Sequence, residues 1–201
     1  MLDKIIPPQI DGDKSDNIYS VTCNNIEDAI SLYQKSVNKL LNVNSWEKIS
    51  KGIIKAGFKL CDRFGNEVDR LPQQGDHFKI DIPGPGSIGG EGYDWVKIEN
   101  FFTDADKIND TDLISINVRP ASCPLNNKDS IAHFFSDSST STFLIKREKT
   151  IVTAQIHGRN EKPNEQSENT VDVIRNKVVA TGAMLSFSDI QWKQLAIGFL
   201  S

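Results

Sequence analysis

The chain has 201 residues, of which 38% are hydrophobic and 25% charged, and its formal net charge at pH 7 is −4. This length predicts one domain whose core is stable without disulfide or metal staples. The acidic balance argues against general nucleic-acid binding, because neutralising phosphates requires a basic surface. The sequence shows neither a signal peptide nor the ~20 apolar residues that cross a bilayer, so a soluble, cytoplasmic protein without membrane insertion is predicted.

The N-terminal part is predicted to be a polar arm over residues 1–23 and a helical region over residues 24–57. In NNIEDAISLYQKSVNKLLNV the apolar residues recur at helical spacing and form one stripe, and Asn24 or Asn25 can cap the helix. A shorter helix is predicted in SWEKISKGIIKAG, with Ser45 as its N-cap.

Residues 58–157 change to a period of two, which is typical of strands. FKLCDRFGNEVDRL is predicted to be a hairpin that turns near Gly65, and HFKIDIP, DWVKIENFF and DLISINVRP alternate apolar and polar side chains. STFLIKREKTIVTAQIHG predicts two strands joined near Glu148. Strands that follow one another without intervening helices indicate an antiparallel meander.

The C-terminal part begins with the polar segment 158–169, which is predicted to be an exposed loop, and continues as a mainly helical region over residues 170–201. Ser188 and Gln191 have the spacing of a capping box at the start of the last helix. The predicted fold is therefore a single α+β domain. In it, a bent or partly closed antiparallel sheet of five to six strands is flanked by N-terminal and C-terminal helices.

The order of helix, curved antiparallel sheet and C-terminal helix resembles the helix-grip, lipid-transfer type of fold. The resemblance is one of element order and includes no motif. The pattern departs from that fold because two helices precede the strands and two helical segments follow them. A shared fold would in any case not fix the function.

The segment IDIPGPGSIGGEGYDWVKIEN contains a literal G-x-G-x-x-G at Gly84, Gly86 and Gly89. A dinucleotide fingerprint requires a helix at its end, whereas a strand is predicted here, so the glycines are interpreted as serving a turn. The alternative is a loop that contacts a ligand or partner, because glycines permit close backbone approach. Its candidate residues are Gly86, Gly89, Gly90, Tyr93, Asp94 and Trp95.

The stretch QIHGRNEKPN holds the candidate catalytic residues. His157 could act as a general base with Glu161 to orient it, while Arg159 or Arg119 could bind an anionic group. The alternative is an ordinary strand end at which these side chains face solvent and Arg159 pairs with Glu161.

No cofactor or metal is predicted. DGDKSDNIYSVT begins like a calcium loop but has Asp16 where glycine is required and Thr22 where a bidentate glutamate is required. The cysteines form no C-x-x-C pair and are interpreted as buried hydrophobic residues, and the histidines lack a metal-ligand spacing. These residues are Cys23, Cys61, Cys123, His77, His133 and His157.

The function favoured by the sequence is a non-catalytic binding or protein-interaction module, with an unknown protein or small molecule as its partner. One alternative is a hydrolase or lyase that acts on an anionic small molecule and uses His157 as its base. Another is a self-associating structural protein, because the chain has amphipathic terminal helices and potential sheet edges.

Overall fold

A computed structural model describes residues 5–50, 56–82, 86–165, 171–173, 176 and 183–201. Its helical elements are α1 (Ile26–Leu41), the 3-10 turn η2 (Val43–Ser45), α2 (Trp46–Ile49) and α4 (Ala183–Phe199). Its strands are β1 (Asp13–Thr22), β2 (Gly57–Cys61), β3 (His77–Asp81), β4 (Asp94–Asp106), β5 (Thr111–Pro120), β6 (Thr140–Glu148) and β7 (Ile151–Glu161).

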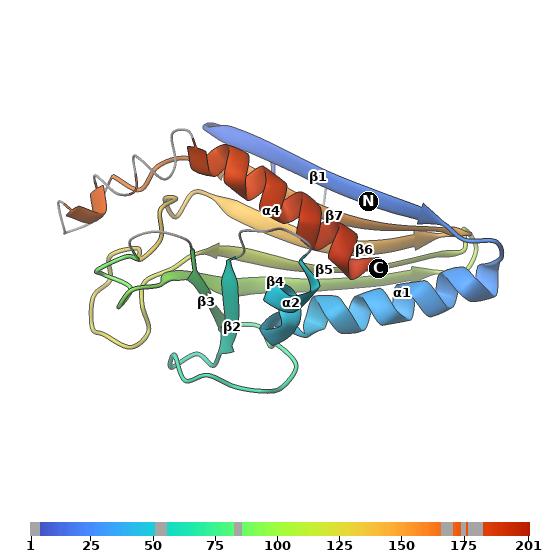
Figure 1. Cartoon of the computed structure of the whole chain (residues 1–201), viewed down its shortest axis with the longest axis horizontal. Coiled ribbons are helices and arrows are strands. Elements are labelled where there is room, and N and C mark those ends of the chain that lie inside the picture. Colours follow the sequence, from blue (N-terminus) through green and yellow to red (C-terminus); the bar gives the residue numbers. More distant parts are fainter. Residues whose placement is uncertain (1–4, 51–55, 83–85, 166–170, 174–175, 177–182) are drawn as a thin grey trace.

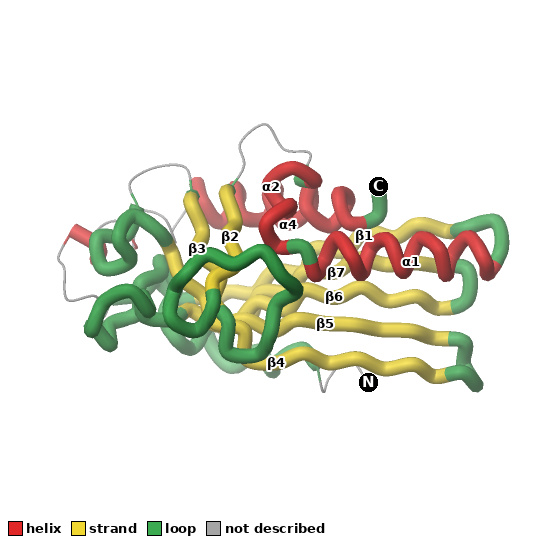
Figure 2. The backbone as a smooth tube through the Cα atoms, turned by 90° about the horizontal axis from the view of Figure 1, so that it is seen from below, coloured by secondary structure: helices red, strands yellow, loops and turns green. Residues whose placement is uncertain are grey.

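The strands form one antiparallel sheet in the order β1-β7-β6-β5-β4-β3-β2. Helices α1 and α4 lie on the same face of this sheet, which we call the inner face (Figure 2). The protein is therefore an α+β domain with a bent antiparallel sheet, as the sequence predicts. The sheet has seven strands rather than five or six.

The additional strand is β1, which occupies residues predicted to be a polar arm. It is an edge strand that pairs with β7 from Thr22 opposite Ile151 to Asp13 opposite Glu161. Most of its side chains are exposed, so it lacks the apolar alternation by which strands are recognised. The backbone ladder with β7, rather than the side-chain pattern, stabilises it as a strand.

Helix α1 follows the sequence prediction closely. The Asn25 side chain accepts a hydrogen bond from the Asp28 backbone N–H at 2.8 Å and so caps the first turn. The helix packs its buried residues, among them Ala29 and Leu40, against the inner face at β6 and β7. The predicted second helix is short, because α2 ends at Ile49 and β2 begins at Gly57; residues 51–55 lie outside the described residues.

Trp46 of α2 lies at the centre of the core between the helices and the sheet. It is 0% exposed, and its indole N–H donates to the backbone oxygens of Lys39 and Leu40, at 3.1 Å each. Four phenylalanine rings surround it at centroid distances of 4.7–5.6 Å, and such contacts add to the energy of area burial. These rings belong to Phe58, Phe78, Phe143 and Phe199.

Strands β2 and β3 run across the ends of the long strands, so the sheet is strongly bent (Figures 1 and 2). Only the first residues of β4 pair with β3, and the β4–β5 register shifts between Ile98 and Asn100. Such a bulge bends a strand and increases its local twist. The bend brings the apolar side chains of β2 and β3 toward α4 and encloses a cavity.

Several predicted boundaries shift for a common reason, namely that backbone pairing extends beyond the apolar pattern. The chain turns near Gly65, and Cys61 bridges to Glu67, but the strand partner of β2 is β3 rather than the second half of that hairpin. β7 continues to Glu161, into the predicted polar loop, because both β1 and β6 pair with it.

The last helix also begins earlier than predicted. α4 starts at Ala183, so Ser188 lies inside the helix instead of capping it. In the predicted helical region before it, residues 171–173 are helical, whereas 174–175 and 177–182 lie outside the described residues. In the part of the chain that the structure describes, neither α4 nor any other helix combines the length and apolar character required to span a bilayer.

Candidate functional site

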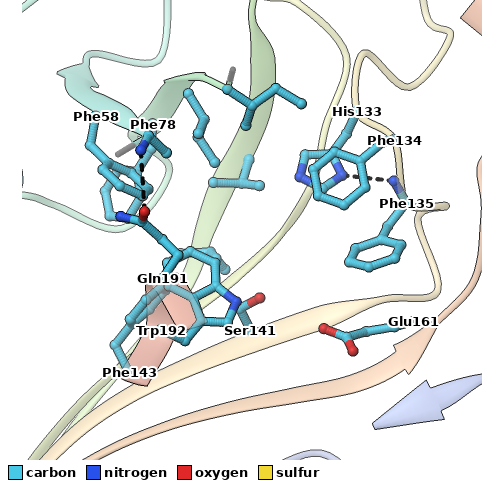
Figure 3. A pocket seen from close by; sticks show the side chains of 15 residues that line it. Phe58, Phe78, His133, Phe134, Phe135, Ser141, Phe143, Glu161, Gln191 and Trp192 are labelled. Carbon is cyan, nitrogen blue, oxygen red and sulfur yellow. Dashed lines mark hydrogen bonds between the residues drawn. The ribbon is translucent and has the colours of Figure 1, made fainter. Parts of the chain in front are cut away.

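A cavity of about 60 Å³ lies between the bent end of the sheet and α4 (Figure 3). Most of its wall is aromatic or aliphatic. The wall is supplied by strands β2 to β7, by the connection between β5 and β6, and by α4. The lining residues are Ala56, Phe58, Phe78, Ile80, Ile82, Val96, Val118, His133, Phe134, Phe135, Ser141, Phe143, Glu161, Gln191 and Trp192.

Helix α4 closes one side of the cavity through two adjacent residues. The Trp192 ring packs edge-on to Phe143 at 5.5 Å and lies 6.0 Å from Phe58. The Gln191 side chain accepts a long hydrogen bond of 3.4 Å from the Ala56 N–H, which ties the helix to the start of β2 (Figure 3). The position of this wall therefore depends on the docking of α4.

The opposite wall is the segment His133–Phe134–Phe135. The rings of His133 and Phe134 stack at 4.3 Å. The Phe135 N–H donates to His133 Nδ1 at 2.9 Å, so this ring nitrogen acts as an acceptor that holds the segment in its turn. The Phe134 N–H donates to the carboxylate of Asp94, a residue that is 0% exposed, which anchors the wall to β4.

Glu161 brings a carboxylate into this apolar cavity (Figure 3). Strict alternation along β7 would place it on the outer face of the sheet, together with His157 and Arg159. The β1–β7 register shifts between Asp13 and Ser15, so three residue steps on β7 oppose two on β1. A bulge of this kind moves the following side chain to the other face.

The backbone conformation of Asn160 completes the change of face. Asn160 has φ = 55°, in the left-handed region that few residues other than glycine adopt. Its side-chain oxygen accepts the N–H of Ile10 at 2.7 Å, and its own N–H donates to the Gln9 side chain at 2.9 Å. The N-terminal arm thus holds the bulge, and the Glu161 carboxylate folds back over Gly158.

Gly158 leaves the space that this carboxylate occupies. A Cβ atom at this position would lie 2.1 Å from Glu161 Oε1 and 2.5 Å from Ser15 Oγ. Glu161 is 6% exposed, and Ser15 Oγ donates to it over a long distance of 3.5 Å. Among the lining residues that the structure describes, Glu161 is the acidic one.

The other catalytic candidates lie on the outer face, away from the cavity. His157 Nδ1 is 2.5 Å from the Asp16 carboxylate and Nε2 is 2.9 Å from the Gln155 side-chain oxygen. Arg159 donates to the same Asp16 carboxylate at 2.7 Å. Arg119 pairs with Glu99 at 2.6 Å. The structure therefore brings His157 and Arg159 together with Asp16 and separates them from Glu161.

Burial controls the ionisation of this outer cluster. It lowers the pKa of His157 below the usual value of 6.5, against the opposing effect of the hydrogen bond with Asp16. Burial also opposes ionisation of Asp16, but the hydrogen bonds from His157 and Arg159 outweigh it and hold the pKa of that carboxyl below 3.8. His157 is 4% exposed and both of its nitrogens are engaged, so a hydrolase or lyase built on it is not supported.

The glycine loop is a series of turns that leads into β4. A Cβ atom at Gly86 would lie 2.0 Å from the Gly92 oxygen, and one at Gly90 would lie 1.9 Å from the Tyr93 oxygen. Both positions therefore require glycine because the backbone approaches so closely. Gly84 lies outside the described residues.

The N–H groups of this loop bind an anion that belongs to the chain itself. Those of Ile88 and Gly89 donate to the Asp172 carboxylate, at 2.9 Å each. Asp172 is 2% exposed, so this carboxylate occupies the position that a ligand anion would take.

The aromatic residues next to the glycine loop face inward. Trp95 is 0% exposed, packs with Cys61 and Cys123, and donates its indole N–H to the Gly90 oxygen at 3.0 Å. Tyr93 is half-buried and its ring lies 4.6 Å from the Lys79 ammonium. These side chains support the loop, as Asp94 supports the wall at Phe134.

The aromatic cavity itself was missed at the sequence level, although one signal was present. Three successive rings in AHFFS interrupt a segment otherwise rich in serine, and a turn does not require them. Within the described residues, no group of three or more histidine, cysteine or acidic side chains is arranged to hold a metal ion. Burial raises the pKa of Cys61 to about 11, so this thiol is not activated.

No protein-family model and no curated protein sequence matches the chain. Solved structures show distant similarity. One is a STAR-related lipid transfer protein from Xanthomonas axonopodis, which has 10% sequence identity and a TM-score of 0.44. The alignment covers 92% of this chain and 85% of that one. Truncated norcoclaurine synthase from Thalictrum flavum has 7% identity, 96% coverage of both chains and a TM-score of 0.36.

A major latex-like protein from Panax ginseng has 13% identity, with 85% of this chain and 94% of that one covered and a TM-score of 0.31. Because these TM-scores lie below 0.5, the likenesses assign neither a family nor a function to this chain. The chemistry of the site follows from its own residues.

Proposed function

We propose that the protein is a non-catalytic binding module that holds a small, largely apolar molecule in the cavity between the bent sheet and α4. The observation that carries this proposal is the cavity itself, with its wall of aromatic side chains and a few polar groups. This combination of an apolar wall with sparse, convergent polar groups is typical of small-molecule sites.

The size of the cavity limits the ligand. Its volume of about 60 Å³ is smaller than the ~150 Å³ of an engineered cavity that admits benzene. The part of the ligand that enters is therefore a group of a few heavy atoms. Ser141 on β6 and Gln191 on α4 supply polar groups that can orient it.

The non-catalytic part of the proposal rests on how the ionisable side chains are used. His157, Asp16 and Arg159 form a mutual cluster on the outer face. At the cavity, the imidazole of His133 receives the Phe135 N–H and thereby holds the wall in place. These contacts give His157, Asp16, Arg159 and His133 structural roles.

The test is a titration of the protein with ethanol, 2-propanol and tert-butanol. Binding is monitored through the NMR signal of the Trp192 indole N–H. Each added carbon is expected to tighten binding about fourfold until the cavity is full, since a buried CH₂ contributes ~0.8 kcal/mol. The Ser141→Leu variant, which fills the cavity, should weaken binding at least tenfold.

The matched control is Ser138→Leu, which changes an exposed serine outside the cavity and should leave the dissociation constants unchanged. Titrations without saturation for all three alcohols would contradict the proposal. Equal affinities in wild type and folded Ser141→Leu would also contradict it, since the alcohols would then bind elsewhere.

A further inference from the structure

We infer that the ligand of this cavity is a small carbonyl compound, a ketone or an aldehyde, whose oxygen accepts hydrogen bonds from Ser141 and Trp192. This inference rests on the proposed function and adds the chemical class of the ligand. Its basis is a pair of hydrogen-bond donors in a wall that is otherwise largely apolar.

The first observation is that these two lining side chains donate to no other part of the described chain. The Ser141 hydroxyl on β6 and the Trp192 indole N–H on α4 are half-buried. Within the described residues, no backbone or side-chain atom accepts a hydrogen bond from either group. The indole N–H groups of Trp46 and Trp95, in contrast, both donate to backbone oxygens. An indole N–H that is removed from water usually has such an acceptor, and at Trp192 a ligand can supply it.

The second observation is the direction of the two donors. On the sheet, Ser141 lies between Val118 of β5 and Gly158 of β7, and neither of these residues has a polar side chain. In Figure 3 the Ser141 hydroxyl and the indole nitrogen of Trp192 both point into the cavity, on the side that faces Phe135. Because the cavity measures only about 60 Å³, one ligand oxygen can accept from both donors.

The third observation is that the other polar side chains of the described lining already have contacts within the chain. Gln191 accepts from the Ala56 N–H and donates to Ser50 Oγ, at 3.4 Å each. Glu161 and His133 accept hydrogen bonds from other parts of the chain. A ligand can therefore use the serine and tryptophan donors without displacing a contact that holds the wall.

A carbonyl oxygen matches this pair of donors better than a hydroxyl group does. It has two lone pairs and no proton, so it can accept from both donors at once. A ligand hydroxyl would add a third donor, and one of the three would stay unpaired, which is costly in a buried site. Ketones and aldehydes provide the acceptor oxygen without burying a charge among apolar side chains.

The experiment compares acetone with 2-propanol, its alcohol, and with isobutene, in which a CH₂ group replaces the carbonyl oxygen. The NMR signal of the Trp192 indole N–H again reports binding. Wild type is expected to bind acetone about threefold or more tightly than 2-propanol, because a neutral hydrogen bond contributes about two- to tenfold in affinity. The indole N–H signal should move downfield with acetone, as that of a donating N–H does, and not with isobutene.

Two variants test the donors separately. Ser141→Ala and Trp192→Phe each remove one donor and keep most of the side-chain volume. Each should weaken acetone binding by about threefold or more and change the affinity for isobutene by less than about twofold. In Trp192→Phe the methyl signals of Ile80, another lining residue, report binding. The control is Ser138→Ala, which changes an exposed serine outside the cavity and should leave all three affinities unchanged.

Equal binding of acetone and 2-propanol to wild type would overturn the carbonyl inference but not the proposed function. Equal losses of affinity for acetone and isobutene in either folded variant would also overturn it, because the side chain would then act through its shape. Absence of saturable binding by all three probes would overturn both proposals.

Discussion

His157 and Glu161 lie four residues apart on β7 and illustrate two different uses of a buried titratable side chain. His157 faces the outer side of the sheet, where Asp16 and Gln155 contact its two ring nitrogens. Glu161 is turned to the inner side and faces an aromatic cavity. The first arrangement stabilises an edge strand, and the second places a polar side chain in the wall of the cavity.

The difference shows that polar residue types do not by themselves indicate a site. On the outer face the polar row continues across the sheet, since Asn117 donates to Thr142 at 3.0 Å and to the oxygen of Ile5 at 2.9 Å. The N-terminal arm covers this row, and Ile5 is 5% exposed. These side chains bond with one another on the outer face, whereas Glu161 lines the cavity on the inner face.

The largest expected effect concerns how much side chains on the inner and outer faces of the sheet contribute to the free energy of unfolding. Phe143→Ala on the inner face removes a ring that packs on Trp46 and Trp192, and should lower the free energy of unfolding by about 3–5 kcal/mol. Thr142→Ala, one residue earlier on the outer face, should lower it by about 1 kcal/mol. Urea denaturation measures both, and equal losses would contradict this division.

The next effect tests the outer cluster. Asp16→Asn removes the carboxylate that both His157 and Arg159 contact, and should cost about 1 kcal/mol because Asp16 is partly exposed to water. Asp13→Asn, on the exposed part of the same strand, is the control and should change stability by less than about 0.5 kcal/mol. Faster amide exchange confined to β1 and β7 in Asp16→Asn would localise the effect. A loss as large in the control would refute the role of the cluster.

A similar but local effect is expected when the space beneath Glu161 is filled. Gly158→Ala places a Cβ atom against the carboxylate, which can move because it ends a flexible side chain, so a cost of about 1 kcal/mol is expected. The double variant with Glu161→Gln should show a non-additive loss of stability, because the two residues are in contact.

The smallest effect is the pH dependence that His157 confers. Because its pKa in the folded protein is below 6.5, the unfolded chain takes up the proton first as the pH falls. Its contribution to stability is therefore complete above about pH 7 and is lost as the pH falls through 6.5 toward the folded pKa. His77 has the same sign, since burial also lowers its pKa.

Urea midpoints at pH 7.5 and 5.5 measure this effect. The urea midpoint should decrease less between pH 7.5 and pH 5.5 in His157→Gln than in wild type. It should decrease less again when His77→Phe is added. An unchanged or larger decrease in His157→Gln would show that the pKa of His157 is not lowered by folding.

Much of the sheet could be predicted because the inner face alternates with a polar outer face. Phe78 and Ile80 in β3 and Ile114 and Ile116 in β5 follow this period and are buried. β1 could not be predicted in this way, because the side chains of this edge strand are mostly exposed and do not alternate between apolar and polar residues.

The candidate site was predictable only in part. Glu161 was singled out by its place beside His157, but the partner assigned to it was on the opposite face. The bulge that separates them depends on the register between β1 and β7, two strands that lie far apart in the sequence, as the pair of Thr22 with Ile151 shows. No local pattern encodes such a register.

Local patterns in the sequence predict α1, with its apolar stripe and the Asn25 cap, and the strands of the meander from β3 to β7. Contacts between distant segments set three other features: Glu161 faces the cavity, Trp95 is buried, and Asp172 binds the glycine loop. The two groups differ because side-chain periodicity reports burial along one segment. Backbone register, bulges and contacts between distant segments are set by the energy of the whole assembled sheet.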